Sequence, residues 1–399
     1  MHIECTNGNP IVDTLDHLPP LPLLVNYRYI KTERDELGIY HALRLRNRLR
    51  HIHLYLPPSI LHKCLMLMDG PFPRLEHLSL SFADDKITTL TLPKAFLAPN
   101  LRHLSLPGIG PPKRLRLLTS TVSLVILVLR NIQTSSYFRP KLLVARLSSL
   151  PQLEQLSIHF SAPIPRPSTE RELLGEQGTP LTLPNLKTFR FQGVGVYLES
   201  LVAQIRAPLL ERLDIALFNQ IAFALPHLSH LINITEGLIP PTMMLSFRRN
   251  EVTIFGVHHS FTSSDERFLL RVMCKQADWQ IDSAAQICGA LIPALSSIER
   301  FALDTGADIL PTEWKNAEID STTLNELLRP FIGVKELHIN SWLLGELFRA
   351  LQGDEGSDPG FLPDLQNIVA SSNRFSSFID ARRVVGRPVQ FSERTSRSR

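Results

Sequence analysis

Pro73-Arg-Leu-Glu-His-Leu-Ser-Leu80 and Pro99-Asn-Leu-Arg-His-Leu-Ser-Leu106 are near-copies of one phrase. Both read L-x-x-L-x-L, and their first leucines, Leu75 and Leu101, lie 26 residues apart. A leucine pattern that recurs every ~20–29 residues predicts a leucine-rich repeat. Each such repeat is a short strand with a return segment, and its apolar face is buried only when neighbouring repeats stack on it.

The phrase recurs through the first half of the chain. Its first leucines are Leu49, Leu75, Leu101, Leu124, Leu153, Leu186 and Leu210. The intervals between them are 26, 26, 23, 29, 33 and 24 residues, and chance does not produce such a series. A proline stands two residues before the leucine in most copies. Because proline stops a helix and favours extended backbone before it, we interpret it as marking the start of each strand.

The fold class that this pattern predicts is α/β, an irregular leucine-rich-repeat solenoid with a parallel concave sheet and a mostly helical convex side. After residue 215 the phrase decays, and degenerate copies begin at Ile298, Val334 and Leu365. Alternation over residues 244–257 predicts two strands joined by a hairpin near residues 248–250. Helices are predicted at residues 35–48, 58–68, 137–147, 196–205, 284–295, 322–331 and 343–351.

We predict one continuous solenoid over residues 11–391, with clear repeats at 49–216 and degenerate repeats at 217–391. Residues 1–10 and the basic tail 392–399 are predicted to be disordered. A proline-rich insertion at residues 161–180 interrupts the period. Ala83, Ile109 and Ile132 stand where such repeats usually carry asparagine, so we expect an irregular arc.

Composition describes an ordinary folded protein. Of the 399 residues, 44% are hydrophobic and 20% are charged, and the formal net charge is +4. Such a balanced charge argues against a nucleic-acid partner. The four cysteines lack C-x-x-C spacing, which predicts unpaired thiols in a reducing compartment. No signal peptide and no membrane-spanning segment is visible, so a cytoplasmic or nuclear location is expected.

The residues between the leucines are predicted to form rows across the sheet, because successive strand residues point to opposite faces. We expect this concave face to bind a protein partner. The first row contains His51, His77, His103, Ile126, Gln155, Thr188 and Arg212, and the second contains His53, Ser79, Ser105, Val128, Ser157, Arg190 and Asp214. The third row contains Tyr55, Ser81, Pro107, Arg130, His159, Gln192 and Ala216.

Two features of these rows have alternative interpretations. The histidines at 51, 77 and 103 suit a metal or a pH-sensitive patch, since imidazole binds zinc and copper, but they equally suit an ordinary solvated face. Ile126 and Val128 put apolar groups on a polar face. They are interpreted either as a contact patch for a partner or as residues covered by the loop 161–180.

No enzyme is predicted. The phosphate-binding, dinucleotide-binding, zinc-protease and nucleophile-elbow motifs are all absent from the sequence. His258 and His259 with Cys274 and Cys288 match no usual zinc spacing, so no metal or other cofactor is expected.

The sequence resembles a family of F-box/leucine-rich-repeat-like proteins of mushroom-forming fungi. The matching segments are Asp35-Glu-Leu-Gly-Ile-Tyr-His-Ala-Leu43, Leu56-Pro-Pro-Ser-Ile-Leu61, Pro151-Gln-Leu-Glu-Gln-Leu-Ser-Ile158, Tyr197-Leu-Glu-Ser-Leu201, Ala207-Pro-Leu-Leu-Glu211, Leu217-Phe-Asn-Gln220, Trp279-Gln280, Phe378-Ile-Asp-Ala-Arg382 and Gly386-Arg-Pro388. The resemblance implies the substrate-binding part of an SCF-type ubiquitin ligase adaptor, with the repeats binding the substrate protein.

One departure from that family concerns the F-box itself. Members carry an F-box ahead of the repeats, whereas here the repeats begin near the start of the sequence. The segment Leu56-Pro-Pro-Ser-Ile-Leu61 echoes an F-box opening but lies between two repeat phrases, so we interpret it as a return helix. Binding to the SCF adaptor subunit is therefore expected only if an F-box is supplied upstream, and the alternative is a free-standing interaction scaffold.

Overall fold

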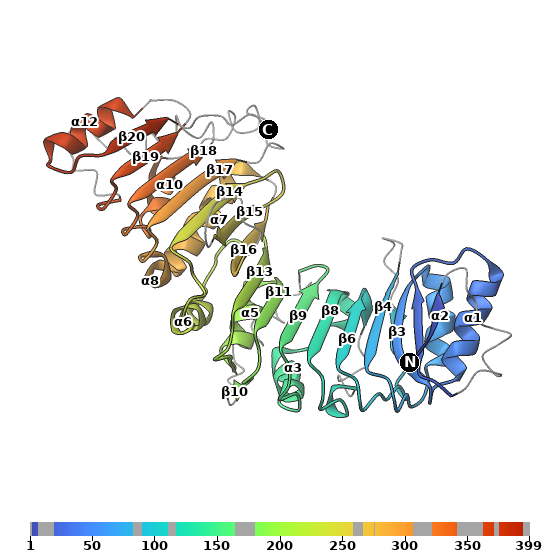
Figure 1. Ribbon diagram of the computed structural model, residues 1–399. Coiled ribbons are helices and arrows are strands. Elements are labelled where there is room, and N and C mark those ends of the chain that lie inside the picture. Colours follow the sequence, from blue (N-terminus) through green and yellow to red (C-terminus); the bar gives the residue numbers. More distant parts are fainter. Residues whose placement is uncertain are drawn as a thin grey trace. The chain divides into compact units, whose positions relative to one another are not determined.

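The computed structural model describes residues 2–6, 20–82, 90–110, 117–163, 180–257, 266–274, 276–305, 321–340, 362–370 and 375–393. The structure is mixed α/β, and most neighbouring strands of its sheet are parallel (Figure 1). It divides into two compact units. The N-terminal unit comprises Met1–Gly193 and Ser200–Leu210, and the C-terminal unit comprises Val194–Glu199 and Glu211–Arg399. The single solenoid over residues 11–391 stays a prediction.

The sheet of the N-terminal unit is parallel throughout its described strands. Their order is β1-β2-β3-β4-β6-β8-β9-β11, which is also their order along the chain. These strands are β1 (Ile3–Thr6), β2 (Leu23–Tyr27), β3 (Leu49–Leu56), β4 (His77–Phe82), β6 (His103–Pro107), β8 (Ile126–Ile132), β9 (Gln155–Phe160) and β11 (Thr188–Gly193). Each leucine phrase except the earliest thus begins two residues before its strand.

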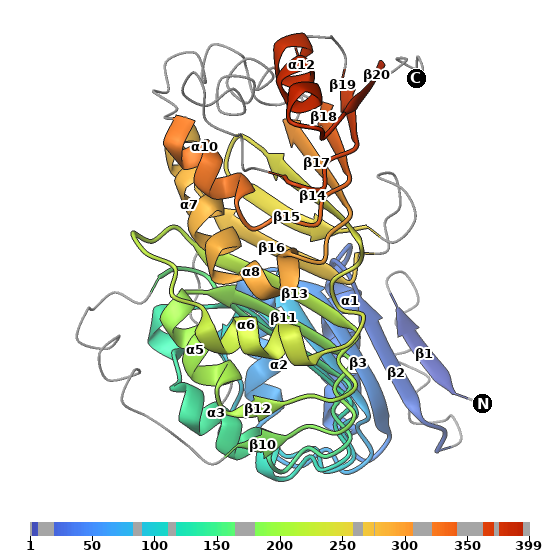
Figure 2. The same cartoon turned by 90° about the vertical axis from the view of Figure 1, so that its left-hand side faces the viewer.

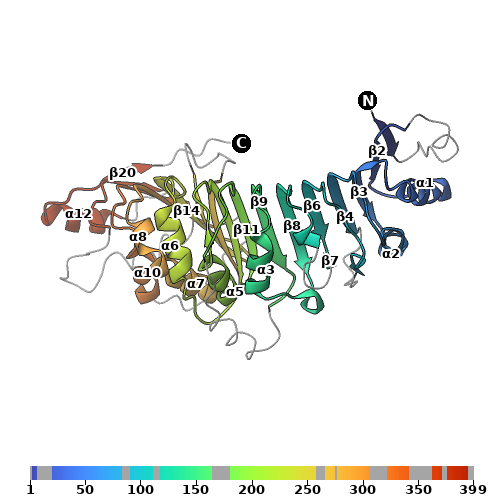
Figure 3. The same cartoon turned by 90° about the horizontal axis from the view of Figure 1, so that it is seen from below.

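The return segments of this unit contain helices at the places where the sequence predicts them. They are α1 (Glu33–Arg44), α2 (Pro58–Leu67) and α3 (Pro140–Leu147), together with the 3-10 turn η2 (Thr134–Ser136). Figure 3 shows α2 and α3 on the same side of the strands. Other return segments form short parallel pairs outside the main sheet, β5 (Leu90–Thr91) with β7 (Ile109–Gly110) and β10 (Leu181–Thr182) with β12 (Ile205–Arg206).

A recurrent turn leads into the strands, and it corrects our interpretation of the prolines. The first leucine of a phrase donates its N–H to the carbonyl three residues earlier, as Leu75 does to Phe72 at 3.2 Å. Pro73 therefore lies at the second turn position, where its fixed φ is favourable. Helix α2 has already ended at Leu67, so the proline shapes the turn and does not stop the helix. The same bond closes the turns at Leu101, Leu124, Leu153, Leu186 and Leu210.

The C-terminal unit departs from a purely parallel sheet. Its strand order is β13-β16-β15-β14-β17-β18-β19-β20. The predicted hairpin is confirmed, because β14 and β15 pair antiparallel and Arg248 donates its N–H to the Glu251 carbonyl across the turn. The strands are β13 (Arg212–Phe218), β14 (Thr242–Phe247), β15 (Val252–Gly256), β16 (Phe268–Met273), β17 (Arg300–Thr305), β18 (Glu336–Asn340), β19 (Asn367–Ala370) and β20 (Gln390–Glu393).

Helices connect these strands, and α7 packs beside α10 (Figure 2). Residues 226–231, whose sequence Pro-His-Leu-Ser-His-Leu begins like a repeat phrase, are helical. Pro226 occupies the first turn of that helix, and the Glu199 carboxylate accepts the N–H groups of His227 and Leu228 at 2.8 and 2.9 Å. The helices are α6 (Pro226–Ile234), α7 (Ala277–Ala290), α8 (Ile292–Leu295), α10 (Ser321–Leu328) and α12 (Ser376–Val384), while α5 (Gly195–Val202) lies where the units divide along the chain. The helix predicted at 343–351 lies outside the described residues.

The core consists of the phrase leucines and their neighbours. Leu78, Leu80 and Leu101 have no exposed surface, and Leu104 is 2% exposed. The four cysteines are buried and unpaired, as predicted. Burial raises the pKa of the Cys64 thiol to about 12. No described helix has both the length and the apolar character needed to cross a bilayer.

The predicted disorder at the two ends needs one correction. Ile3–Thr6 forms β1 and pairs parallel with β2, so this part of residues 1–10 is ordered. At the other end β20 reaches Glu393, whereas residues 394–399 lie outside the described part of the chain.

Candidate functional site

The strands place the predicted face residues as follows: His51, His53 and Tyr55 on β3, His77 and Ser79 on β4, His103 and Ser105 on β6, Ile126, Val128 and Arg130 on β8, Gln155, Ser157 and His159 on β9, Arg190 on β11, and Arg212 and Asp214 on β13. The register confirms the first row through the N-terminal unit, because His51 pairs with His77, His77 with His103, and His103 with Ile126. It continues from Ile126 to Gln155 and Thr188.

His77 lies between the other two histidines of the first row, and its ring is close to both. The ring centroids of His77 and His103 lie 4.0 Å apart in a stacked arrangement, and those of His51 and His77 lie 5.5 Å apart. Burial of the ring, followed by repulsion from His103, His51 and His53, lowers the pKa of His77 to about 4. Burial also lowers the pKa of His51 and of His103. Near neutral pH the three rings of this cluster are therefore mainly uncharged.

The register also confirms the second row, but its exposure differs from a solvated face. His53 pairs with Ser79, Ser79 with Ser105, and Val128 with Ser157. Ser157 has no exposed surface, and Ser79 and Val128 are 9% and 7% exposed. Ser157 lies between Val128 of β8 and Arg190 of β11 in this register. Ser79, Val128 and Ser157 therefore contribute little surface to a partner.

The third row is interrupted at β8. The register between β8 and β9 shifts between Leu129 and Ile132, and Asn131 has a φ of +52°. This bulge adds a residue to β8, so the predicted alignment of Arg130 with His159 is broken. On either side of it the row holds, from Tyr55 to Ser81 and from His159 to Gln192. Tyr55 is 42% exposed.

Ile126 and Val128 are interpreted either as a contact patch for a partner or as residues covered by the loop 161–180, and the structure bears on the first alternative. Val128 is too buried to add to a contact patch, whereas Ile126 is half-buried. Most of the loop 161–180 lies outside the described residues, so covering by that loop stays a prediction.

Arg212 and Asp214 belong to the C-terminal unit. The Asp214 carboxylate forms an ion pair with the Arg271 guanidinium of β16, with 3.1 Å between Oδ1 and Nη2, and both side chains are partly buried. This pair joins β13 to β16 across a parallel register. Asp214 is thus a structural partner of Arg271 within its own unit.

The metal interpretation of the histidine row finds no geometric support. Within the part of the chain that the structure describes, no three His, Cys, Asp or Glu side chains are placed to hold a metal ion. His258 and His259, weighed with the cysteines as ligands, lie outside that part.

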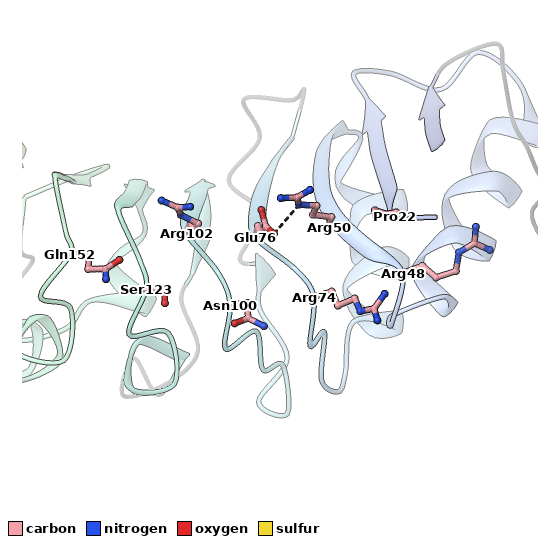
Figure 4. A pocket seen from close by; sticks show the side chains of 9 residues that line it. All are labelled: Pro22, Arg48, Arg50, Arg74, Glu76, Asn100, Arg102, Ser123 and Gln152. Carbon is pink, nitrogen blue, oxygen red and sulfur yellow. Dashed lines mark ion pairs between the residues drawn. The ribbon is translucent and has the colours of Figure 1, made fainter. Parts of the chain in front are cut away.

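A second surface was not predicted from the sequence. A shallow pocket of about 550 Å³ lies where the strands of the N-terminal unit begin (Figure 4). Its lining residues, which we call the arginine pocket, are Pro22, Arg48, Arg50, Arg74, Glu76, Asn100, Arg102, Ser123 and Gln152. Most of these directly precede or follow the first leucine of a phrase. The 26-residue spacing of 48, 74 and 100, and of 50, 76 and 102, was the signal that could have revealed them.

The backbone brings these positions together. Glu76 donates its N–H to the Arg50 carbonyl at 2.9 Å, and Arg102 donates its N–H to the Glu76 carbonyl at 2.8 Å. The Glu76 carboxylate pairs with Arg50 Nε at 2.8 Å, as the dashed line in Figure 4 shows. The Asn100 side-chain amide donates to the Pro73 carbonyl at 2.7 Å and ties one turn to the next.

No protein-family model matches the chain, and a search of curated proteins found no match.

Proposed function

We propose that this chain is a non-enzymatic protein-recognition module of the leucine-rich-repeat solenoid type. It binds its partner on the predicted concave face, the side of the parallel strands that carries the three rows beginning at His51, His53 and Tyr55, which we call the outer face. The observation that carries the proposal is the first row. Side chains of one kind repeat on adjacent strands in a shared register, from His51 to His77 to His103. Strands about 4.8 Å apart then offer a continuous surface of closely spaced side chains, which suits an extended protein partner.

The chemistry of this face supports recognition of a protein. Closely spaced neutral imidazoles provide aromatic and hydrogen-bonding surface, and exposed Tyr55 on the same strand as His51 is of a residue type enriched in protein interfaces. Because burial keeps the histidine pKa values low, little charge must be desolvated when a partner covers the rings.

Photo-crosslinking tests which side of the strands meets the partner. Benzoylphenylalanine replaces Tyr55 on the outer face or Met66 of α2, which are 42% and 67% exposed. A partner on the outer face crosslinks from position 55 and not from position 66. Equal crosslinking from both positions, or crosslinking from 66 alone, contradicts the proposal.

Two versions of this function follow from the resemblance to F-box/leucine-rich-repeat-like proteins. In the first, the chain is the substrate-binding part of an SCF-type ubiquitin ligase adaptor. In the second, it is a free-standing interaction scaffold without coupling to the ligase. Co-purification with the SCF adaptor subunit at native expression discriminates them, since only the first version requires it.

A further inference from the structure

The arginine pocket is built by the same turns that start the strands. Each turn presents one residue before the first leucine and one after it, and parallel pairing brings these residues of successive repeats side by side. The lining spans the starts of six strands, from Pro22 before β2 to Gln152 before β9. At about 4.8 Å per strand the pocket is roughly 24 Å long.

Positive charge is concentrated in this pocket. Four arginines and one glutamate line it, a surplus of three positive charges, whereas the whole 399-residue chain carries a net charge of only +4. Arg74 and Arg102 are exposed, and among the described residues no acidic side chain pairs with either. Arg50 forms an ion pair with Glu76, and 51% of the Arg50 side chain remains exposed to solvent. The pocket therefore keeps uncompensated guanidinium groups in one place.

The geometry favours an extended carboxylate-bearing ligand. Arginine binds carboxylates through paired N–H groups, and several arginines in a row suit several acidic groups. The other end of the lining is neutral and polar, with Ser123 and Gln152, which can bond a peptide backbone. A pocket of roughly 24 Å accommodates about seven residues of extended chain at ~3.3 Å each.

Single-stranded nucleic acid fits this lining less well. Proteins that bind it place aromatic side chains where bases can stack. None of the nine described lining residues is aromatic, and Glu76 would repel a phosphate backbone at the centre of the arginines.

We propose that the arginine pocket binds an extended acidic peptide segment of a protein partner. The proposal rests on the recognition role proposed above, but it uses a different surface from the outer face. The partner would place its carboxylates against Arg74 and Arg102 and its neutral backbone toward Ser123 and Gln152.

Fluorescence polarisation of the full chain tests the proposal with a labelled heptapeptide that contains four glutamates. The matched peptide carries glutamine at those four positions. The double variant Arg74→Glu/Arg102→Glu is expected to weaken binding of the glutamate peptide at least tenfold in low salt, because two contacts become repulsive. The control Arg206→Glu/Arg329→Glu makes the same charge change at exposed arginines outside the pocket and is expected to change affinity less than twofold.

A second variant distinguishes the pocket from a damaged fold. Glu76→Gln removes the one carboxylate of the lining and releases Arg50 from its ion pair. It is expected to tighten binding of the glutamate peptide at least threefold, a gain that misfolding does not produce.

Three results would overturn the proposal. They are equal binding of the glutamate and glutamine peptides, equal loss in the pocket and control variants, and tighter binding of a seven-nucleotide oligothymidine than of the glutamate peptide. These results concern the pocket alone. Crosslinking from position 55 tests the outer face independently, so failure of one proposal is visible without failure of the other.

Discussion

The two units start their strands in the same way but order those strands differently. In the N-terminal unit the described strands follow one another in parallel, whereas β15 of the C-terminal unit runs antiparallel between β14 and β16. Yet the turn that places Leu75 also places Ile298, Val334 and Leu365, with N–H to carbonyl distances of 3.1 to 3.3 Å. The repeated element is thus the turn with a buried apolar residue at its end, and leucine itself is replaceable there.

A cross-strand ion pair beside that turn recurs as well. Lys187 pairs with Glu154 at 3.1 Å in the N-terminal unit, and Lys335 pairs with Glu299 at 2.7 Å in the C-terminal unit. In both cases the lysine donates its backbone N–H to the carbonyl of the same glutamate. The N-terminal unit with its regular phrases and the C-terminal unit with its degenerate phrases therefore share the same lysine–glutamate pair beside the same turn.

Core truncation is the strongest test of whether the degenerate unit packs as well as the regular one. Leu78 of β4 has no exposed surface, and Leu303 of β17 is 2% exposed. Leu78→Ala and Leu303→Ala should each lower the free energy of unfolding by about 2–5 kcal/mol, because each leaves a cavity. Urea denaturation measures both. A loss below about 1 kcal/mol at either position would show that its unit is loosely packed.

A buried glutamine holds the hairpin that sets the C-terminal unit apart. The Gln280 side chain is 1% exposed and donates to the carbonyls of Arg248 and Cys274 at 2.6 and 3.0 Å. Gln280→Leu should cost about 1–3 kcal/mol of unfolding free energy, since both acceptors lose their donor. Gln152→Leu makes the same change at an exposed position and should leave the denaturation midpoint nearly unchanged. If the two variants unfold alike, the hairpin does not depend on Gln280.

The histidine row should make the N-terminal unit acid-sensitive. Unfolded His77 takes up a proton near its ordinary pKa of 6.5, whereas folded His77 does so only at about 4. Between these values the unfolded state binds more protons, so the free energy of unfolding falls as the pH falls from 6.5 towards 4. His77→Gln should reduce the loss between pH 7.5 and pH 5 by about 1–2 kcal/mol, allowing for solvent screening.

Exposed His62 of α2 provides the matched control for that experiment. His62→Gln should leave the pH dependence of denaturant unfolding close to that of the unaltered chain. An identical pH dependence for His77→Gln would mean that the stacked row does not disfavour protonation.

The smallest effect is expected at the shared ion pairs. Lys187→Ala should cost about 0.2–1 kcal/mol of unfolding free energy in low salt, because the pair is largely exposed. Lys335→Ala should shift the unfolding midpoint in the same direction. Raising the salt to about 0.5 M should shrink both effects, since screening weakens exposed charges. An effect that persists in high salt would assign these lysines a packing role instead.

Much of the fold was predictable because strand periodicity is local. The spacing of the leucine phrases predicted the main-sheet strands β3, β4, β6, β8, β9, β11 and β13, and hence the row that contains His51, His77 and His103. The hairpin at 248–251 and the helices α2 and α3 were also correct, since turn residues and apolar spacing act over a few positions.

Exposure within the rows was not predictable from the same pattern. Alternation places Ser157 on the outer face between Val128 of β8 and Arg190 of β11, yet its side chain has no exposed surface, and strand alternation does not contain the packing of neighbouring side chains. The bulge at Asn131 likewise shifts Arg130 by an amount that no repeat spacing shows.

By itself the sequence determined the repeat, the register of the first row in the N-terminal unit and the burial of the phrase leucines, because these follow from a two-residue strand period and a recurrent turn. Only the tertiary structure decided that arginines 26 residues apart share one pocket, that Glu199 caps α6, and that β15 also pairs antiparallel with β16. The arginine pocket and the Glu199 cap depend on side chains that meet across more than twenty residues of sequence. The pairing of β15 depends on the order of strands in the sheet, which a local sequence pattern does not contain.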